Sequence, residues 1–293
     1  MDSCPSGDPF DASDEYAGLK YSGYWFGAVE AYRGEPDCRW PANFGTRLGG
    51  NFALPLWSSQ GLGGQFGLSY GTFDWHGRGS TTTDTAGWAE ELIWSVGVFQ
   101  RASPCDLDCG LPVSWGISYD WLRTDNFGLD SNELLLTQWR AQVEYALSAC
   151  DAVGVWAALH DRGDGQGNII IGHSNLESLD QINAFWRHKL ESDAEFRVWV
   201  GAAADPGEFS VGGELNIPLS CHFAAFMAAH YIKPSASGGD GLGWHDEYYM
   251  LTAGISYFPG GTAINDTVFG RRWMPYLLVP DNGSFAARTD ASK

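Results

Sequence analysis

Hydrophobic and polar residues alternate along many stretches of this chain, most clearly from Tyr249 to Phe258. One set of alternate positions is apolar and begins and ends with an aromatic residue: Tyr249, Leu251, Ala253, Ile255 and Tyr257. The positions between them are mostly small or polar: Thr252, Gly254 and Ser256. Successive side chains of a β-strand point to opposite faces, so the pattern predicts a strand with one apolar face. An apolar face with aromatic residues at both ends is typical of a strand that spans a membrane.

The same alternation, bounded by turn residues, recurs along most of the chain. In one example, Phe66, Leu68 and Tyr70 alternate with Gln65, Gly67 and Ser69. We predict twelve strands, over residues 20–33, 47–57, 63–73, 89–101, 112–122, 133–147, 152–160, 179–190, 195–204, 208–219, 221–232 and 248–258. Residues 181–189 also fit a short helix, and that alternative stays open.

The predicted connections alternate between short and long. Those after strands 2, 6, 8 and 10 are short, whereas the long polar ones cover residues 34–46, 74–88, 123–132, 161–178 and 233–247. Membrane-spanning barrels show this alternation because one end has tight turns and the other has long loops. An even number of strands places both ends of the barrel segment at the tight-turn end. The chain is therefore expected to be all-β, with a single antiparallel transmembrane β-barrel.

Together these features resemble bacterial outer-membrane β-barrels of the small porin-like kind, over residues 20–258. The resemblance implies short periplasmic turns, long external loops, location in a bacterial outer membrane and contact with its lipids. It also implies a final strand that ends in an aromatic residue, which Phe258 matches. We expect an irregular N-terminal segment over residues 1–19 and, beyond the usual end of such barrels, a C-terminal periplasmic tail or plug over residues 259–293.

Composition narrows the possible partners. The 293 residues carry a formal net charge of −19 with only 17 Lys and Arg, which argues against binding to nucleic acid. The chain contains no apolar run of about 18 residues, so the sequence predicts no transmembrane helix. The N-terminus does not fit a signal peptide. The apolar stretch 271–278 of the tail could fill the lumen, lie along the barrel base or contact a periplasmic partner. A homo-oligomer is a further possibility.

Alternation alone does not decide which face lies inside, because a soluble barrel or sandwich buries its apolar face. The predicted polar face is rich in Gly, Ser and Gln, and aromatic residues recur at strand ends. Both features favour a barrel with lipid outside and water inside.

Eight charged residues are expected on the inward face: Glu91, Asp120, Arg140, Glu144, Arg187, Lys189, Arg197 and Glu214. In an open pore such residues select ions. In a narrow barrel the same residues pair with one another, fill the lumen and stiffen it. A barrel of twelve strands lies between the filled eight-stranded barrels and the open 16–18-stranded porins, so both interpretations stay open.

The cysteines favour disulfide bonds. Four of the six lie in predicted tight-turn connections, where periplasmic exposure would oxidise them: Cys105, Cys109, Cys150 and Cys221. Cys4 should lie at the same end, and Cys38 in an outer loop. Cys105 and Cys109 could also hold a metal ion, but no His or second Cys pair stands at zinc-like spacing. The acidic loops 160–165 and 239–241 lack the full spacing of a Ca²⁺ site. We therefore expect no metal and no cofactor.

Three functions remain after these exclusions. We expect an outer-membrane channel for passive diffusion of small solutes or ions. The alternatives are a non-conducting structural or adhesin-type barrel that acts through its loops and tail, and a soluble β-barrel that binds a ligand. Outer-membrane lipases carry a His-x-Ser pattern, which none of the seven His residues matches, and the adjacent His173 and Ser174 would face opposite ways on a strand. We therefore expect no enzymatic activity.

Overall fold

The computed structural model describes residues 22–34, 42–57, 61–73, 88–104, 106–127, 132–168, 172–203, 208–233, 247–260, 263–265, 267–270 and 273–290. The predictions for residues 1–19, Cys4, Cys38, Cys105 and the acidic loop 239–241 lie outside these residues.

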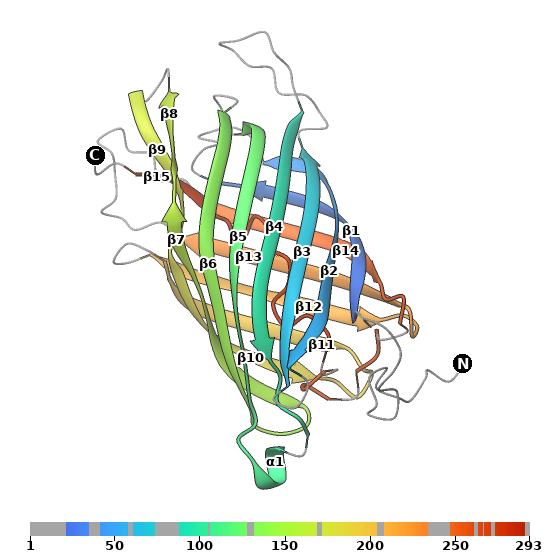
Figure 1. Ribbon diagram of the computed structural model, residues 1–293. Helices are drawn as coiled ribbons and strands as arrows, with labels where there is room; N and C mark the ends of the chain where they lie inside the picture. Colours follow the sequence, from blue (N-terminus) through green and yellow to red (C-terminus); the bar gives the residue numbers. More distant parts are fainter. Residues whose placement is uncertain are drawn as a thin grey trace.

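Twelve antiparallel strands form one closed barrel (Figure 1). They are β1 (Ser22–Arg33), β2 (Asn43–Trp57), β3 (Leu62–Phe73), β4 (Ala89–Gln100), β5 (Val113–Phe127), β6 (Asn132–Ala146), β7 (Asp151–Arg162), β10 (Gln181–Lys189), β11 (Glu195–Ala203), β12 (Phe209–Pro218), β13 (Phe223–Lys233) and β14 (Tyr248–Tyr257). The barrel closes where β1 pairs with β14, with Val29 opposite Ala253. All twelve predicted strands are present, and residues 181–189 form a strand rather than a helix.

A second, three-stranded sheet lies at the end of the barrel that carries the long loops, called the loop end below (Figure 1). It consists of β8 (Asp164–Asn168), β9 (Gly172–Ser178) and β15 (Ala287–Asp290), in the order β15-β9-β8. The sequence did not predict these strands because they show no apolar alternation. At the opposite, tight-turn end, a single helical turn, α1 (Asp106–Cys109), lies between β4 and β5.

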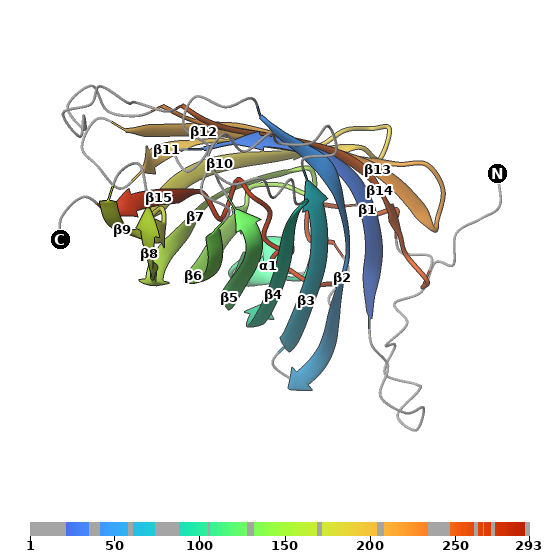
Figure 2. The same cartoon turned by 90° about the horizontal axis from the view of Figure 1, so that it is seen from above.

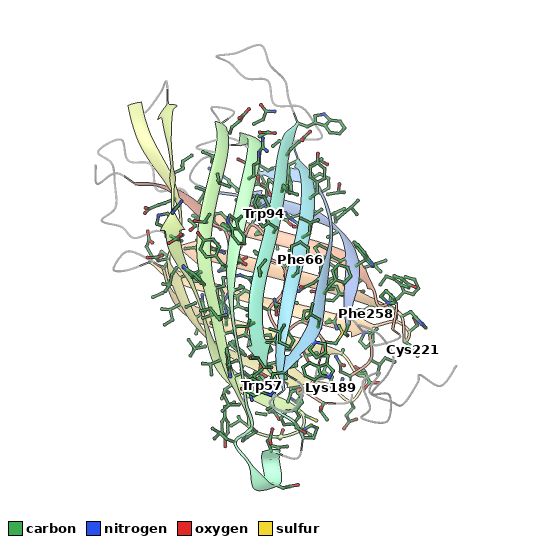
Figure 3. The ribbon with its side chains drawn as sticks, in the orientation of Figure 1. Trp57, Phe66, Trp94, Lys189, Cys221 and Phe258 are labelled. Atoms are coloured by element: carbon green, nitrogen blue, oxygen red, sulfur yellow. The ribbon has the colours of Figure 1, made fainter. Side chains whose placement is uncertain are left out.

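The two faces of the barrel wall have the predicted orientation. Apolar side chains such as Leu48, Ile117 and Ile255 are 65%, 39% and 54% exposed on the outside. Polar side chains such as Asn51 and Asp120 are fully buried inside. A soluble barrel would have the opposite arrangement, so the wall is that of a membrane-spanning barrel. Figure 3 draws the side chains along the wall, with Trp57 and Lys189 near the tight-turn end.

No helix among the described residues is long and apolar enough to cross a membrane.

The described residues between 263 and 287, called the C-terminal segment below, pass through the inside of the barrel (Figure 2). At the tight-turn end, Val268 and Phe269 pack in a cluster with Ala102, Ala146 and Ala152. At the loop end, Phe285 and Ala286 belong to a larger apolar cluster of the barrel interior. The segment thus crosses the whole lumen, and β15 follows it at the loop end.

This path can be compared with the two alternatives that the sequence left open. We expected the chain after the last barrel strand to stay at the tight-turn end as a periplasmic tail, or to enter the lumen as a plug. The segment is inside the lumen, and Ala287–Asp290 lie at the opposite end from Phe258. A twelve-stranded barrel is too wide to be filled by the side chains of its own wall alone, so an extra segment can pack inside it.

Candidate functional site: the lumen

Arg101, which directly follows β4, holds the C-terminal segment at the tight-turn end. Its guanidinium donates hydrogen bonds to the carbonyl oxygens of Phe269, Met274 and Pro275 at 3.2, 3.1 and 2.7 Å. It also lies over the ring of Tyr276, 5.1 Å from the centroid. Burial lowers the pKa of Arg101 to about 10, so the side chain stays protonated at neutral pH. A buried carbonyl without a partner costs free energy, and one cation satisfies three of them here.

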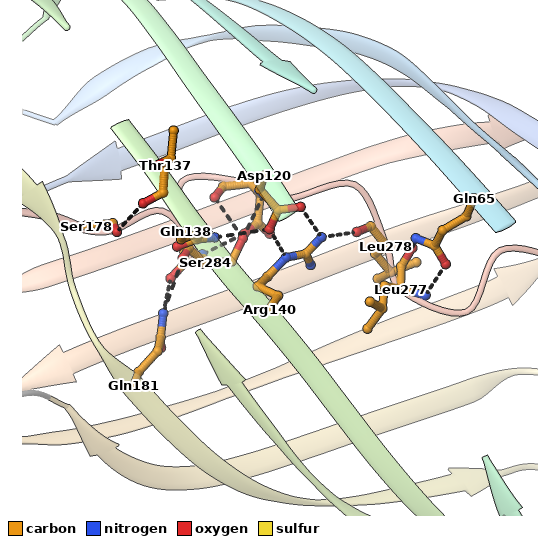
Figure 4. Close-up of polar contacts among 12 residues, drawn as sticks. Gln65, Asp120, Thr137, Gln138, Arg140, Ser178, Gln181, Leu277, Leu278 and Ser284 are labelled. Atoms are coloured by element: carbon orange, nitrogen blue, oxygen red, sulfur yellow. Dashed lines mark hydrogen bonds and ion pairs between the residues drawn. The ribbon is translucent and has the colours of Figure 1, made fainter. Parts of the chain in front are cut away.

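In the middle of the lumen, side chains of the wall bind the backbone of the segment (Figure 4). Gln65 donates to the Leu277 carbonyl at 2.9 Å and accepts from the amides of Tyr276 and Leu277, both at 3.1 Å. Asn51 donates to the same carbonyl at 2.8 Å. Gln65 therefore pairs with this backbone as a neighbouring strand would, which fixes the position of the segment across the barrel.

Towards the loop end, the wall holds the segment in the same way. Asn282 donates to Glu30 at 2.7 Å, and Tyr248 donates to the carbonyl of Asn282. Gln181 donates to the carbonyls of Gly283 and Ser284 at 3.3 and 3.4 Å. The backbone amide of Leu179 donates to the Ala286 carbonyl at 2.7 Å. The segment is thus held from several sides of the barrel over its full length.

The first of the predicted inward charges, Glu91, is bound to an arginine that the prediction did not include. Arg47 lies 3.0 Å from Glu30 and 2.6 Å from Glu91, and all three side chains are almost fully buried. Tyr32 donates a further hydrogen bond to Glu91 at 2.6 Å. The alternation of the first two predicted strands could have placed Glu30 and Arg47 on the inward face. It could not have shown that the two side chains are in contact.

The other predicted charges also form ion pairs. Asp120 pairs with Arg140, whose Nη2 also donates to the Leu278 carbonyl at 2.8 Å. Arg197 contacts both oxygens of Glu214, at 2.9 and 3.0 Å.

Arg187 pairs with Glu144 and lies 3.4 Å from Glu195, and it also donates to the Val268 carbonyl. Lys189 lies 3.5 Å from Asp193 in the turn after β10. The structure thus places all eight predicted residues in ion pairs. Their role in ion selectivity stays a prediction.

The C-terminal segment does not fill the lumen completely. A cavity of about 250 Å³ lies beside it, and a smaller one of about 80 Å³ lies towards the loop end. Both are lined by Gln142, Arg197 and Glu214 on the wall and by Leu278 and Asp281 on the segment. The two cavities therefore adjoin, and the Arg197–Glu214 pair lies where they meet.

The cysteines give a mixed result. Cys150 lies in the tight turn between β6 and β7 and is a free, exposed cysteine, so the disulfide predicted for it is wrong in this structure. Cys221 lies in the turn between β12 and β13, where its carbonyl accepts a hydrogen bond from Ala263. Cys221 is disulfide-bonded, as the sequence predicts. The side chains of Cys105 and Cys109 lie outside the described part, and disulfide pairing of these two cysteines stays a prediction. No group of described residues has the composition of a metal site.

One Ser–His contact escaped the sequence analysis. Ser210 Oγ lies 2.7 Å from His230 Nε2, and the two side chains are 0% and 4% exposed. The residues are twenty positions apart and lie on neighbouring strands, where Ser210 is opposite Ile232. Such a pair can be found only once the strand register is known. The rings of Trp156 and Trp199 lie 6.2 and 5.5 Å from the His230 ring, which places the pair in a tightly packed aromatic cluster.

Comparisons with known proteins agree on the architecture. A chain from a solved structure described as "Unveiling the Mechanism Behind the in-meso Crystallization of Membrane Proteins" has a TM-score of 0.52 at 11% identity, covering 91% of this chain and 100% of that one. The COG4313 outer membrane channel from Pseudomonas putida F1 has a TM-score of 0.48 at 12% identity, covering 85% and 99%. The KdgM porin has a TM-score of 0.44 at 6% identity, covering 81% and 98%.

The last two are described as an outer-membrane channel and a porin, and at 11% identity the likeness to the first shows the fold alone. No curated protein matches the chain. A family model described as "Family of unknown function (DUF6666)" matches residues 23–287, which span the barrel and the C-terminal segment. The chain therefore belongs to this family of unknown function, DUF6666.

Proposed function

We propose that this protein is an outer-membrane channel for passive diffusion of small solutes, and that the path runs beside the C-terminal segment. The observation that carries the proposal is the pair of adjoining cavities of about 250 and 80 Å³ inside the barrel. The larger cavity reaches Phe258 and Met274 near the tight-turn end, and the smaller one reaches His230 and Met250 further towards the loop end. A path through cavities of this volume would admit only small solutes.

Location in a bacterial outer membrane belongs to the same proposal. The exposed apolar side chains around the wall support contact with membrane lipids. The long loops would then be external and the tight turns periplasmic. Association with a second copy or with a periplasmic partner stays a prediction.

The second candidate is a barrel that its own C-terminal segment seals. The hydrogen bonds of Arg101, Gln65 and Gln181 to the segment favour it, because they hold the segment at three levels of the lumen. In that case the protein would act through its loops and the small sheet at the loop end. Conductance separates the two candidates directly.

The test is conductance of the purified full-length chain in planar bilayers. Ala228 lines both cavities, whereas Ala229, the next residue on β13, faces outward. Ala228→Trp should therefore lower the wild-type conductance strongly by filling the path. Ala229→Trp should leave it unchanged, because it adds an aromatic side chain on the lipid face. A wild-type barrel that does not conduct would end the channel proposal and favour the sealed barrel.

The proposal includes no catalysis. Ser210 is fully buried, and neither cavity is lined by it, which supports a structural role for its hydrogen bond with His230. A serine nucleophile needs a base within reach and also access for the substrate. An esterase assay on the wild type and on Ser210→Ala tests this part, and hydrolysis lost in the variant would contradict it.

A further inference from the structure

Four aromatic rings form a continuous strip inside the barrel, where the sequence predicts a polar face. The ring of Tyr24 lies 5.3 Å from Phe258 and 6.3 Å from Phe26, and Phe26 lies 6.1 Å from Phe226. All four side chains line the larger cavity. We call these residues the aromatic strip. Buried aromatic rings usually pack against other apolar groups, whereas these rings also face an open space, which leaves ring surface available to a solute.

The same cavity is bordered by a row of ion pairs on the next strands of the wall. The row consists of Arg187, Glu195, Arg197 and Glu214, and we call it the charged row. Arg197 is bound to Glu214 through both carboxylate oxygens and to Gln142 at 3.0 Å. Its guanidinium also lies 5.3 Å from the ring centroid of Phe185. These contacts hold the donors and acceptors of the row in fixed positions beside the cavity.

The charges around the cavity almost balance. Its described lining includes five carboxylates and four guanidiniums. Four of the carboxylates already lie in ion pairs: Glu30 with Arg47, Glu144 and Glu195 with Arg187, and Glu214 with Arg197. Arg101 donates to three backbone carbonyls, and Asp281 accepts hydrogen bonds from the amide and hydroxyl of Ser284. An ion that entered would have to compete with these partners. Breaking a buried ion pair is costly, so the lining disfavours ions of either sign.

We propose that this cavity is a binding site for a neutral, ring-shaped polyhydroxylated solute, of the size of a monosaccharide. One face of such a ring carries C–H groups that can rest on the aromatic strip, since aromatic rings present a negative face. Its hydroxyl groups both donate and accept hydrogen bonds, so they fit a row that offers guanidiniums and carboxylates together. The inference names the solute class of the path proposed above, and its biological meaning rests on that proposed function.

The size of the cavity supports a small solute. Pockets that take drug-sized ligands span about 300–1,000 Å³, and this cavity of about 250 Å³ lies below that range. Tyr276, Leu278 and Val279 of the C-terminal segment form part of the lining, so the segment helps to shape the site. A single sugar ring fits such a space, whereas a lipid or a long oligomer does not.

The test is calorimetric titration of the full-length chain in detergent with three probes: D-glucose, D-glucuronate and D-glucosamine. The three share a ring and differ in charge. We expect D-glucose to bind at least tenfold more tightly than either charged probe. Phe226→Leu, which keeps an apolar side chain but removes the ring, should weaken D-glucose binding about tenfold, as loss of about 1.4 kcal/mol of stacking implies. Phe223→Leu on the outward face of the same strand is the matched control and should bind as the wild type does.

Three results would overturn the inference: no binding of D-glucose, tighter binding of a charged probe, or equal affinity of Phe226→Leu and the wild type. Binding is measured apart from conductance, so the two proposals fail separately. Sugar binding to a barrel that does not conduct would contradict the channel proposal but still support the sugar-binding site. Conductance without sugar binding would contradict the sugar-binding site but still support the channel proposal.

Discussion

Replacement of Arg101 by methionine tests how the C-terminal segment is held in the lumen. The change removes three hydrogen bonds from a charged donor to backbone carbonyls, each worth about 1.5–3 kcal/mol. The change also removes the positive charge of Arg101, which lies inside the barrel and forms no ion pair with the described residues. Removal of this charge offsets several kcal/mol of the cost of the lost hydrogen bonds. We expect a net loss of about 3 kcal/mol in the free energy that docks the segment at the tight-turn end.

A loss of about 3 kcal/mol raises the population of the released segment about 150-fold. The amides of Tyr276 and Leu277, which donate to Gln65, should therefore exchange with D₂O about 150-fold faster in Arg101→Met. Single-channel recordings should show longer or larger openings, because release of the segment widens the lumen.

Arg101→Lys should lie between the wild type and the methionine variant, because a lysine ammonium cannot reproduce the planar fork that contacts three carbonyls. Arg123→Met, at an exposed position on β5, is the control for loss of one positive charge. Unchanged exchange at Tyr276 and Leu277 in Arg101→Met would refute the reasoning that Arg101 anchors the segment.

Three further predictions follow from the wall, the ion pairs and the path of the chain. Ile255→Arg should destabilise the barrel in lipid by about 2–4 kcal/mol, measured by urea unfolding, because the side chain faces lipid. Unchanged stability would contradict the assignment of Ile255 to the lipid face. Arg187→Gln should cost about 3–5 kcal/mol because it leaves the buried carboxylate of Glu144 without its cation, and the double variant with Glu144→Gln should recover much of the loss. A cysteine introduced by Asp290→Cys should react with a membrane-impermeant maleimide from the opposite side to the exposed Cys150, and labelling of both from one side would contradict the threaded path.

The sequence by itself determined the barrel strands and their two faces. The reason is local: side-chain direction in a strand depends only on whether a position is odd or even, so Ile117 and Asp120 could be assigned to opposite faces without knowing their neighbours. Lipid outside and packed polar groups inside require the same alternation on every strand. The inward position of all eight predicted charges follows from this rule.

Only the tertiary structure decided what the inward residues contact. Arg47 meets Glu30 and Glu91 through strand register, and Ser210 meets His230 across two strands, so sequence distance gives no guide. The path of the C-terminal segment is equally non-local, because its backbone is held by side chains such as Gln65 and Arg101 from distant parts of the chain. The apolar stretch 271–278 allowed a plug, but without periodicity it did not show which path the segment takes. Its position is fixed by the space that a closed twelve-stranded wall leaves inside and by the donors that point into that space.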